Sequence, residues 1–219
     1  MASKSLVMVQ VPCPICKKSD AEHFLTRRDL NLELDGEFTL VKCNCCGMVY
    51  ENPRPASESW ELLYPDSYDQ YYESTSHTPV KSLETSYGFE KRLDYIRKFQ
   101  KAGNLLDVGC ATGDFLAHAN KDPLWTCYGV EPASYAASLA SKKGLNIENT
   151  AFSQDTFRGV TFDVITLWNV LEHLDDPLGT FELAWEKLSD GGVIVFTTPQ
   201  LESWDYRIFG KYWIGFELP

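Results

Sequence analysis

The sequence predicts an α/β protein: a mainly parallel sheet with helices on both faces, preceded by a small cysteine-rich head. Three observations lead to this fold class. Short apolar runs alternate with helical patterns from residue 83 onward. Each run is continuously apolar, as in strands that are buried on both faces of a parallel sheet. Finally, five of the seven cysteines fall in two tight groups within the first 46 residues.

The composition excludes several classes of protein. A chain of 219 residues that is 44% hydrophobic and 13% aromatic can bury a core, which excludes wholesale disorder. A net charge of -11 without a basic cluster disfavours nucleic acid and anionic membranes as main partners. No run of about 18 apolar residues suggests a membrane span, and the N-terminus is too poor in apolar residues for a signal peptide. We therefore expect a cytoplasmic protein whose partner is a small molecule.

Changes in composition divide the chain into three predicted regions. Residues 1–60 form the cysteine-rich head, residues 61–82 a tyrosine-rich connector, and residues 83–219 the alternating body. The connector either folds over a bound cofactor as a lid or packs as ordinary surface, and both readings stay open. Its candidate contact residues are Tyr64, Tyr68, Tyr71, Tyr72 and His77.

The first half of the body predicts two strands and two helices. Gly103 closes a helix whose apolar residues recur at helical spacing, and a strand over residues 104–108 follows. A second helix begins after Gly113 and leads to a strand over residues 126–130. The apolar residues of the first helix are Phe89, Leu93, Ile96 and Phe99.

The second half repeats this logic. Pro132 and Gly144 bracket an alanine-rich helix, and strands are predicted over residues 146–149 and 162–167. A last helix is capped by Asp176, has Pro177 in its first turn, and ends at Gly191 and Gly192. The run VIVFTTP then reads as a fifth buried strand. The expected apolar face of the last helix consists of Leu178, Phe181, Trp185 and Leu188.

The head contains two C-x-x-C turns, Cys13 to Cys16 and Cys43 to Cys46, separated by 26 residues. Two such turns can bring four thiolates into a tetrahedron, and four soft thiolates favour zinc. A head this small also has little core of its own, which favours a structural metal over buried free thiols or a redox dithiol. Cys45 is expected to be a bystander.

The segment LLDVGCATGDF, residues 105–115, runs from a strand through a glycine-containing turn into a helix, where nucleotide-like cofactors bind in open α/β sheets. A dinucleotide fingerprint would need a third glycine where Asp114 stands, which disfavours an NAD-dependent oxidoreductase. Asp107 would repel a pyrophosphate but pair with an ammonium group. Gly109, Ala111 and Gly113 allow the backbone to approach a cofactor closely.

Glu131 ends the second strand, 24 residues after Asp107. A carboxylate at this place can accept both hydroxyls of an adenosine ribose. Each acid alone could equally be a turn, capping or solvated residue. Together with the glycine loop they favour a cofactor that carries both an ammonium group and a ribose, such as S-adenosylmethionine.

Four segments resemble, in order and spacing, class I S-adenosylmethionine-dependent methyltransferases of the small-molecule type: DVGCATG, GVEP, FDVITLWNVLEHLDDP and LSDGGVIVFTTP. The head, CPIC with CNCCGMVYENPRP, resembles a zinc-binding segment attached to many such enzymes. The resemblance implies a Rossmann-like fold in which Asp107, Gly109 and Gly113 hold the methionine end and Glu131 the ribose. It further implies that Phe152 and Ser153, after the third strand, flank the adenine.

The fourth strand leads to Asn169 and the pair Glu172-His173, which should lie beneath the reactive sulfonium at the carboxyl edge of the sheet. Methyl transfer needs alignment of the reacting atoms, exclusion of water and removal of a proton from the acceptor. His173 is the candidate general base, because a histidine can accept a proton near neutral pH. The alternative is that this pair only ties down the turn.

Only 20 residues follow Pro199, whereas the family fold adds strands six and seven. We expect both strands to be absent, the sheet edge to be exposed and the chain to self-associate. The aromatic residues of the tail are expected to form a helix and a pocket wall. The sequence thus predicts methyl transfer from S-adenosylmethionine to an O, C or N atom of a small molecule. The alternative is an inactive cofactor-binding body whose zinc head docks a protein.

Overall fold

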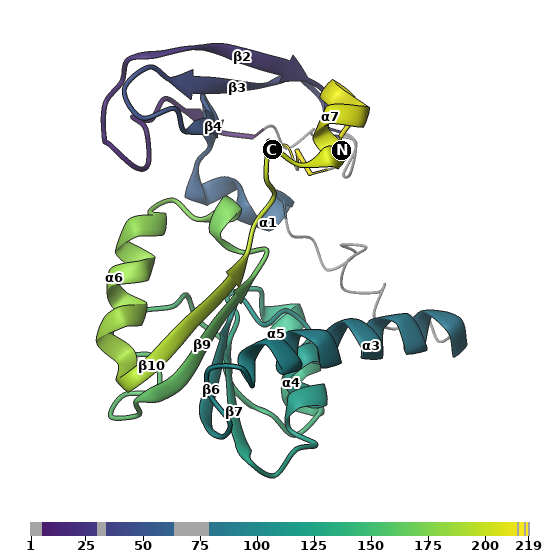
Figure 1. Cartoon of the computed structure of the whole chain (residues 1–219). Helices are drawn as coiled ribbons and strands as arrows, with labels where there is room; N and C mark the ends of the chain where they lie inside the picture. The colour runs from purple at the N-terminus through teal and green to yellow at the C-terminus, as the bar shows by residue number, and fades with distance from the viewer. Residues whose placement is uncertain (1–5, 30–33, 64–78, 214, 217, 219) are drawn as a thin grey trace. The chain divides into compact units, whose positions relative to one another are not determined.

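The computed structural model describes residues 6–29, 34–63, 79–213, 215, 216 and 218 (Figure 1). The chain divides into two compact units. The head unit comprises residues 1–65, 175–178 and 199–219, and the sheet unit comprises residues 66–174 and 179–198. The tyrosines and His77 of the predicted lid lie outside the described residues, so the lid stays a prediction.

The sheet unit contains a five-stranded sheet in the order β10-β9-β6-β7-β8, and every pairing in it is parallel. This confirms the predicted fold class and, for the described part of the chain, the count of five strands. Because all five strands run the same way, their carboxyl ends meet at one edge. The strands are β6 (Gly103–Val108), β7 (Trp125–Val130), β8 (Asn146–Glu148), β9 (Phe162–Trp168) and β10 (Leu188–Thr197).

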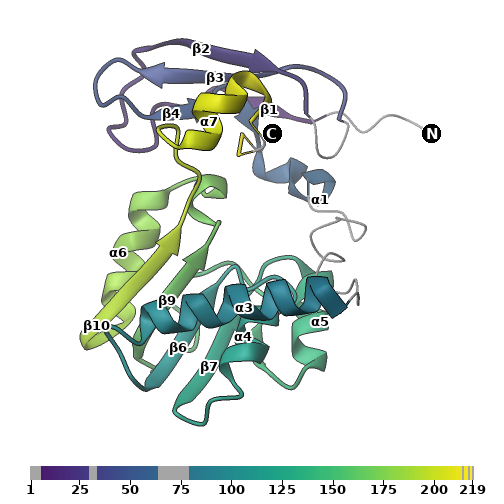
Figure 2. The same ribbon diagram turned by 45° about the vertical axis from the view of Figure 1, so that its right-hand side comes forward.

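Helices cover both faces of this sheet, as Figure 2 shows for α3 and α4 on one side and α6 on the other. Leu93 of α3 and Leu116 of α4 pack with Val164 of the sheet in one apolar cluster. Ala184 of α6 and Ile165 belong to a second cluster. The helices are α3 (Pro79–Ile96), α4 (Asp114–Ala119), α5 (Ser134–Lys142) and α6 (Pro177–Lys187).

Two predicted helix ends are wrong by a few residues. The first helix ends at Ile96, and Phe99, expected on its apolar face, lies in the following turn with 56% of its surface exposed. The last helix ends at Lys187, so Leu188 and the glycine pair belong to β10, whose register shifts between Leu188 and Val193. The two glycines lie within that irregularity, whereas the sequence pattern alone assigns them to a helix end.

The predicted apolar face of α6 is also only partly correct. Trp185 is 72% exposed and Leu178 40% exposed, while Ala184 is fully buried in the cluster against the sheet. The small alanine lets the helix approach the strands closely. The larger side chains that dominate the sequence pattern therefore do not define the buried face.

The head unit contains an antiparallel three-stranded sheet in the order β2-β3-β4, and a separate pair, β1 with β5. The strands are β1 (Met8–Val9), β2 (Ala21–Arg27), β3 (Phe38–Cys43), β4 (Val49–Glu51) and β5 (Arg54–Pro55). The short helices η1 (Ser57–Ser59) and α1 (Trp60–Leu63) follow. The two C-x-x-C segments form turns, one before β2 and one between β3 and β4.

The C-terminal residues belong to the head unit. Helix α7 (Trp204–Phe209) and the turn η3 (Gly210–Tyr212) precede Trp213 and Phe216, which are buried in one cluster with Phe38 and Leu40 of β3. Arg27 Nη1 donates to the backbone oxygens of Lys211 and Trp213, at 3.1 Å each. The predicted helix is confirmed as α7, but Trp213 and Phe216 lie in the core of the head unit. Trp204, Phe209 and Tyr212 are exposed.

None of the described helices combines the length and the apolar character that a membrane-spanning segment needs.

Candidate cofactor site and metal centre

The glycine loop connects β6 to α4 at the carboxyl edge of the sheet, with three residues at positive φ: Gly109 at 68°, Ala111 at 47° and Gly113 at 74°. A Cβ on Gly109 would lie 2.8 Å from Val170 Cγ2, and one on Gly113 would lie 2.8 Å from Ala140 Cβ. Glycine is therefore required at both places by conformation and by space. The loop can present its backbone to a ligand at close range.

Asp107 is the penultimate residue of β6, and only 3% of its surface is exposed. Its Oδ1 accepts a hydrogen bond from Thr166 Oγ1 of β9 at 2.6 Å. Burial raises the pKa of Asp107 to about 7, and Glu131 adds to this; the Thr166 hydrogen bond and the charge of Arg92 act in the opposite direction. A buried carboxylate with so few donors is suited to pairing with a positively charged group.

Glu131 follows β7, the strand next to β6, and is 7% exposed. Its two oxygens accept from different backbone amides: Oε2 from Ala111 N at 2.9 Å and Oε1 from Ala133 N at 2.8 Å. Burial raises the pKa of Glu131, and these two amides oppose the rise. Because a carboxylate oxygen can accept two hydrogen bonds, each oxygen keeps one position for a ligand hydroxyl. Through its bond to Ala111 N, Glu131 also holds the glycine loop in place.

Arg92 of α3 lies beside this pair, and the sequence analysis missed it. Its guanidinium lies over the Trp168 ring, 4.7 Å from the centroid, and its charge lowers the pKa of Asp107. Burial in turn lowers the pKa of Arg92. The available signal was an arginine between Phe89 and Leu93 on the apolar stripe of the predicted helix. Arg92 is half-buried, and together with Asp107 it offers charges complementary to the carboxylate and the ammonium group of an amino acid.

Phe152 and Ser153 lie in the loop after β8. Phe152 is partly buried and packs against the cluster on the α6 face of the sheet. Ser153 N donates to Thr156 Oγ1 at 2.9 Å. Both residues lie beyond the carboxyl end of β8, which pairs in parallel with β7. They therefore lie at the same edge of the sheet as Asp107 and Glu131.

Asn169 and His173 lie after β9 at the same edge. Asn169 has a φ of 54°, its N donates to Thr197 O at 3.1 Å, and its Oδ1 accepts from Thr197 Oγ1 at 2.7 Å. These bonds join the ends of β9 and β10. His173 lies in the turn η2 (Leu171–His173), is partly buried, and donates its backbone N–H to Val170 O.

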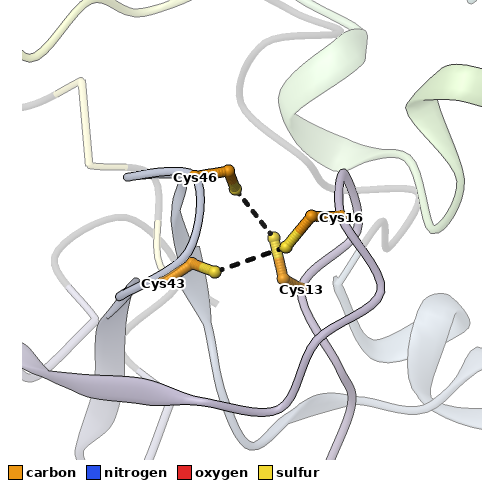
Figure 3. Close-up of side chains that lie close together, drawn as sticks. All are labelled: Cys13, Cys16, Cys43 and Cys46. Atoms are coloured by element: carbon orange, nitrogen blue, oxygen red, sulfur yellow. Dashed lines mark hydrogen bonds between the residues drawn. The ribbon is translucent and has the colours of Figure 1, made fainter.

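The four predicted metal ligands converge in the head unit. The Sγ atoms of Cys13, Cys16, Cys43 and Cys46 all lie within 4.8 Å of one another, and Figure 3 shows them pointing toward a common centre from the two turns. The Cys13–Cys46 and Cys16–Cys43 sulfur distances are both 3.5 Å. A tetrahedral zinc with bonds of about 2.3 Å needs sulfur separations of about 3.8 Å. The cluster therefore fits zinc in both geometry and donor type.

One ligand, Cys43, is held in a turn that favours its thiolate form. Backbone N–H groups point at the sulfur of Cys43, foremost that of Cys46, and lower the pKa of Cys43 to about 6 against the opposing effect of burial. Cys45 is exposed and does not belong to the cluster. The structure pairs none of the seven cysteines in a disulfide.

Solved structures similar to this chain share its fold. A plantazolicin methyltransferase, BpumL, in complex with S-adenosylhomocysteine matches with a TM-score of 0.52 and 19% identity, over 74% of this chain and 65% of that chain. A sugar N-methyltransferase from a Streptoalloteichus species matches with a TM-score of 0.50 and 22% identity, over 63% and 56%.

Curated relatives are named ubiquinone biosynthesis O-methyltransferases. The protein from Actinobacillus pleuropneumoniae is 34% identical in an alignment of 122 positions that covers 49% of this chain and 51% of that protein. The protein from Aliivibrio fischeri is 30% identical in an alignment of 132 positions that covers 54% of this chain and 56% of that protein. The chain thus spans about half the length of the curated relatives that it matches.

A protein-family model described as a methyltransferase domain matches residues 84–219. The match includes the glycine loop, both buried acids and the strand-four loop, and it continues through the C-terminal residues that pack in the head unit. The Rossmann-like five-stranded sheet and the four-cysteine head agree with it. The chain belongs to the methyltransferase family.

Proposed function

We propose that the protein transfers a methyl group from S-adenosylmethionine to an O, C or N atom of a small-molecule acceptor. The observation that carries this proposal is the pair of buried carboxylates, Asp107 and Glu131, at the ends of adjacent parallel strands around a left-handed glycine loop. One acid suits an ammonium group and the other a pair of hydroxyls. A dinucleotide would bring a pyrophosphate to the same edge, where these acids would repel it.

In this proposal, different residues bind different parts of the cofactor. Asp107 pairs with the ammonium group of the methionine end, and Arg92 offers its guanidinium to the carboxylate of that end. Gly109, Ala111 and Gly113 let the loop backbone approach, and Glu131 accepts the ribose hydroxyls. Phe152 and Ser153 flank the adenine, and Asn169 lies near the sulfonium. The bound sulfonium supplies the methyl group as an electrophile.

The protein then has to align the acceptor and remove its proton. Methyl transfer is an in-line displacement, so positioning provides much of the rate enhancement. His173 is the proposed general base because it lies in the turn that follows β9, at the edge that carries the two acids. The family relatives are named O-methyltransferases, which makes a phenolic oxygen the first acceptor class to test.

In the head unit we propose one structural zinc bound by Cys13, Cys16, Cys43 and Cys46. Four protein thiolates fill a tetrahedral coordination sphere, so this metal has no open position for chemistry. We further propose a cytoplasmic location, because a cluster of four thiolates suits a reducing compartment.

The function is tested by following transfer of a labelled methyl group to a panel of catechols, amino sugars and activated carbon acids. We expect turnover on at least one acceptor and its loss in Asp107→Asn. His173→Ala should lower kcat at least tenfold while leaving the affinity for S-adenosylhomocysteine unchanged. Cofactor binding without turnover on any acceptor would favour the inactive binding module instead. Unchanged turnover of a folded His173→Ala protein would remove the base assignment.

A further inference from the structure

The loop of residues 152–157 is held in one conformation by groups that the proposed chemistry does not use. Within the loop, Thr156 is 1% exposed, its backbone N donates to Ser153 O, and its hydroxyl accepts from Ser153 N. Phe157 adopts a φ of 43°, a strained value for an aromatic residue. A loop with such strain needs external support.

That support comes from Lys187, the last residue of α6. Its side chain is buried, with only 7% of the residue exposed, and its Nζ donates to Gln154 O at 2.9 Å and to Thr156 O at 2.6 Å. Lysine is rarely buried unless it is paired, because removing an ammonium group from water is costly. Burial lowers the pKa of Lys187, and Glu148 and Asp155 oppose this.

An ordinary helix-capping role does not account for these contacts. A lysine at a helix C-terminus can bond the last carbonyls of its own helix. Here the two acceptors are carbonyls of the loop, more than thirty residues earlier in the chain. The lysine therefore joins α6 to the loop.

A second charged residue holds the other side of the loop. Glu148 ends β8, and its two oxygens accept from Phe157 N at 3.0 and 3.2 Å. Gln154 in addition donates its side-chain amide to Glu186, the neighbour of Lys187. The loop is thus fixed between the end of β8, an edge strand of the sheet, and the end of α6, by side chains of opposite charge.

We infer that Lys187 is a positioning residue that sets the affinity for the adenine end of the cofactor. The inference rests on the proposed function, in which Phe152 and Ser153 flank the base. Both hydrogen bonds of Lys187 Nζ go to backbone oxygens of the loop, those of Gln154 and Thr156, so it acts through the backbone that carries Phe152 and Ser153. Its removal would leave two loop carbonyls without their charged donor and let the strained loop relax.

The experiment compares Lys187→Met, which keeps the chain length but removes the donor, with Lys187→Arg, which keeps a charged donor. Lys187→Gln, a milder change, serves if the methionine variant does not fold. Ser189→Ala is the matched control. Ser189 lies two residues from Lys187, and its hydroxyl donates a 2.7 Å hydrogen bond to Asp163, which is not part of the loop. Affinity is measured for S-adenosylhomocysteine and for S-ribosylhomocysteine, which has the same ribose and amino acid but no base.

We expect Lys187→Met to bind S-adenosylhomocysteine about tenfold more weakly, as the loss of hydrogen bonds from a charged donor predicts. Its affinity for S-ribosylhomocysteine should stay at the wild-type value, and amide exchange over residues 153–157 should become faster. Lys187→Arg should recover most of the lost affinity, and Ser189→Ala should match the wild type for both ligands.

Two results would overturn the inference. Equal weakening of both ligands would mean that Lys187 acts only on overall stability, and unchanged binding of S-adenosylhomocysteine would mean that the loop does not need it. If the wild-type protein itself binds neither ligand, the proposed function fails, which is a different outcome from a variant that behaves like the wild type.

Discussion

At the scale of single residues, the site depends on burying charges that are costly to bury. Asp107 accepts a hydrogen bond from Thr166 and lies near the cation of Arg92, and its pKa rises to about 7. When the pKa of a group is higher in the folded than in the unfolded protein, the folded protein loses stability as the pH rises from the unfolded-state pKa to the folded-state pKa. For Asp107 this window runs from about pH 4 to about pH 7. Burying the ionised carboxylate of Asp107 is costly, and a bound cation offsets this cost. This favours binding of the ammonium group.

The first prediction concerns pH. Because the ammonium group of S-adenosylhomocysteine requires ionised Asp107, its affinity should rise about fivefold between pH 6 and pH 7 and level off above pH 8. The contribution of Asp107 to the free energy of unfolding of the ligand-free protein should fall over the same pH range. Calorimetric titrations at several pH values measure the first and urea unfolding the second. Asp107→Asn should remove the pH dependence, and a variant that keeps it would assign the titration to another group.

Sequence reasoning predicted Asp107 and Glu131 because both end apolar runs at a fixed spacing. It missed Thr166 and Arg92, since a threonine within a strand and an arginine on a helix have many ordinary explanations. Lys187 was beyond reach, because its two partners are more than thirty residues away in the sequence. Patterns identify residues that end elements, whereas packing decides which other residues support them.

At the scale of elements, the five parallel strands and the glycine loop were predictable, and the ends of helices were less so. The loop glycines follow from strand-turn-helix patterning, and the structure adds the reason that each is needed. Gly113 caps α4 at a φ of 74° and packs against Ala140 of α5. The end of α6 was misplaced because Gly191 and Gly192 lie in an irregular start of β10. A glycine pair signals a break in regular structure but not which element it interrupts.

The second prediction separates backbone strain from crowding at Gly113. Gly144 has nearly the same φ, 77°, but open space around its Cβ position. Both Gly113→Ala and Gly144→Ala incur the positive-φ penalty of about 1 kcal/mol. Gly113→Ala should lower the free energy of unfolding by a further amount of about 1–3 kcal/mol because its Cβ would lie 2.8 Å from Ala140 Cβ. Urea denaturation measures both, and equal losses would show that the neighbouring helix moves freely.

At the scale of the whole chain, the C-terminal residues contribute to the core of the head unit. Trp213, Phe216 and Leu218 are buried with Phe38 and Leu40. The expectation that the head has little core was based on residues 1–60 alone. The structure corrects it, because the tail supplies apolar surface that no local pattern in the head reveals. The cysteine cluster and this aromatic cluster are separate sources of stability in the same unit.

The third prediction concerns the metal. The purified protein should contain about one zinc per chain, and Cys43→Ser should lose it and unfold at a lower temperature, since the remaining thiolates no longer close the tetrahedron. Cys45→Ser is the matched control, because Cys45 is exposed and outside the cluster. Elemental analysis and thermal unfolding measure both effects. Full zinc content in Cys43→Ser would contradict the ligand assignment.

Self-association stays a prediction of the account. Among the described strands β10 lies at the edge of the sheet, Phe196 on it is 46% exposed, and Trp185 of α6 is 72% exposed. Exposed edges with apolar side chains tend to associate. Light scattering should show a mass that rises with concentration, and Phe196→Lys should reduce that rise. A mass that stays that of a monomer at every concentration would argue that the edge does not pair.

The most direct test of the central claim is a calorimetric titration of the 219-residue chain with S-adenosylhomocysteine. The account predicts one binding site with micromolar affinity, lost in Asp107→Asn and weakened in Glu131→Gln, because these two carboxylates carry the cofactor assignment. The wild-type titration uses folded protein with its zinc content measured beforehand. Absence of binding by such protein would contradict the claim that the glycine loop and its two buried acids form a cofactor site.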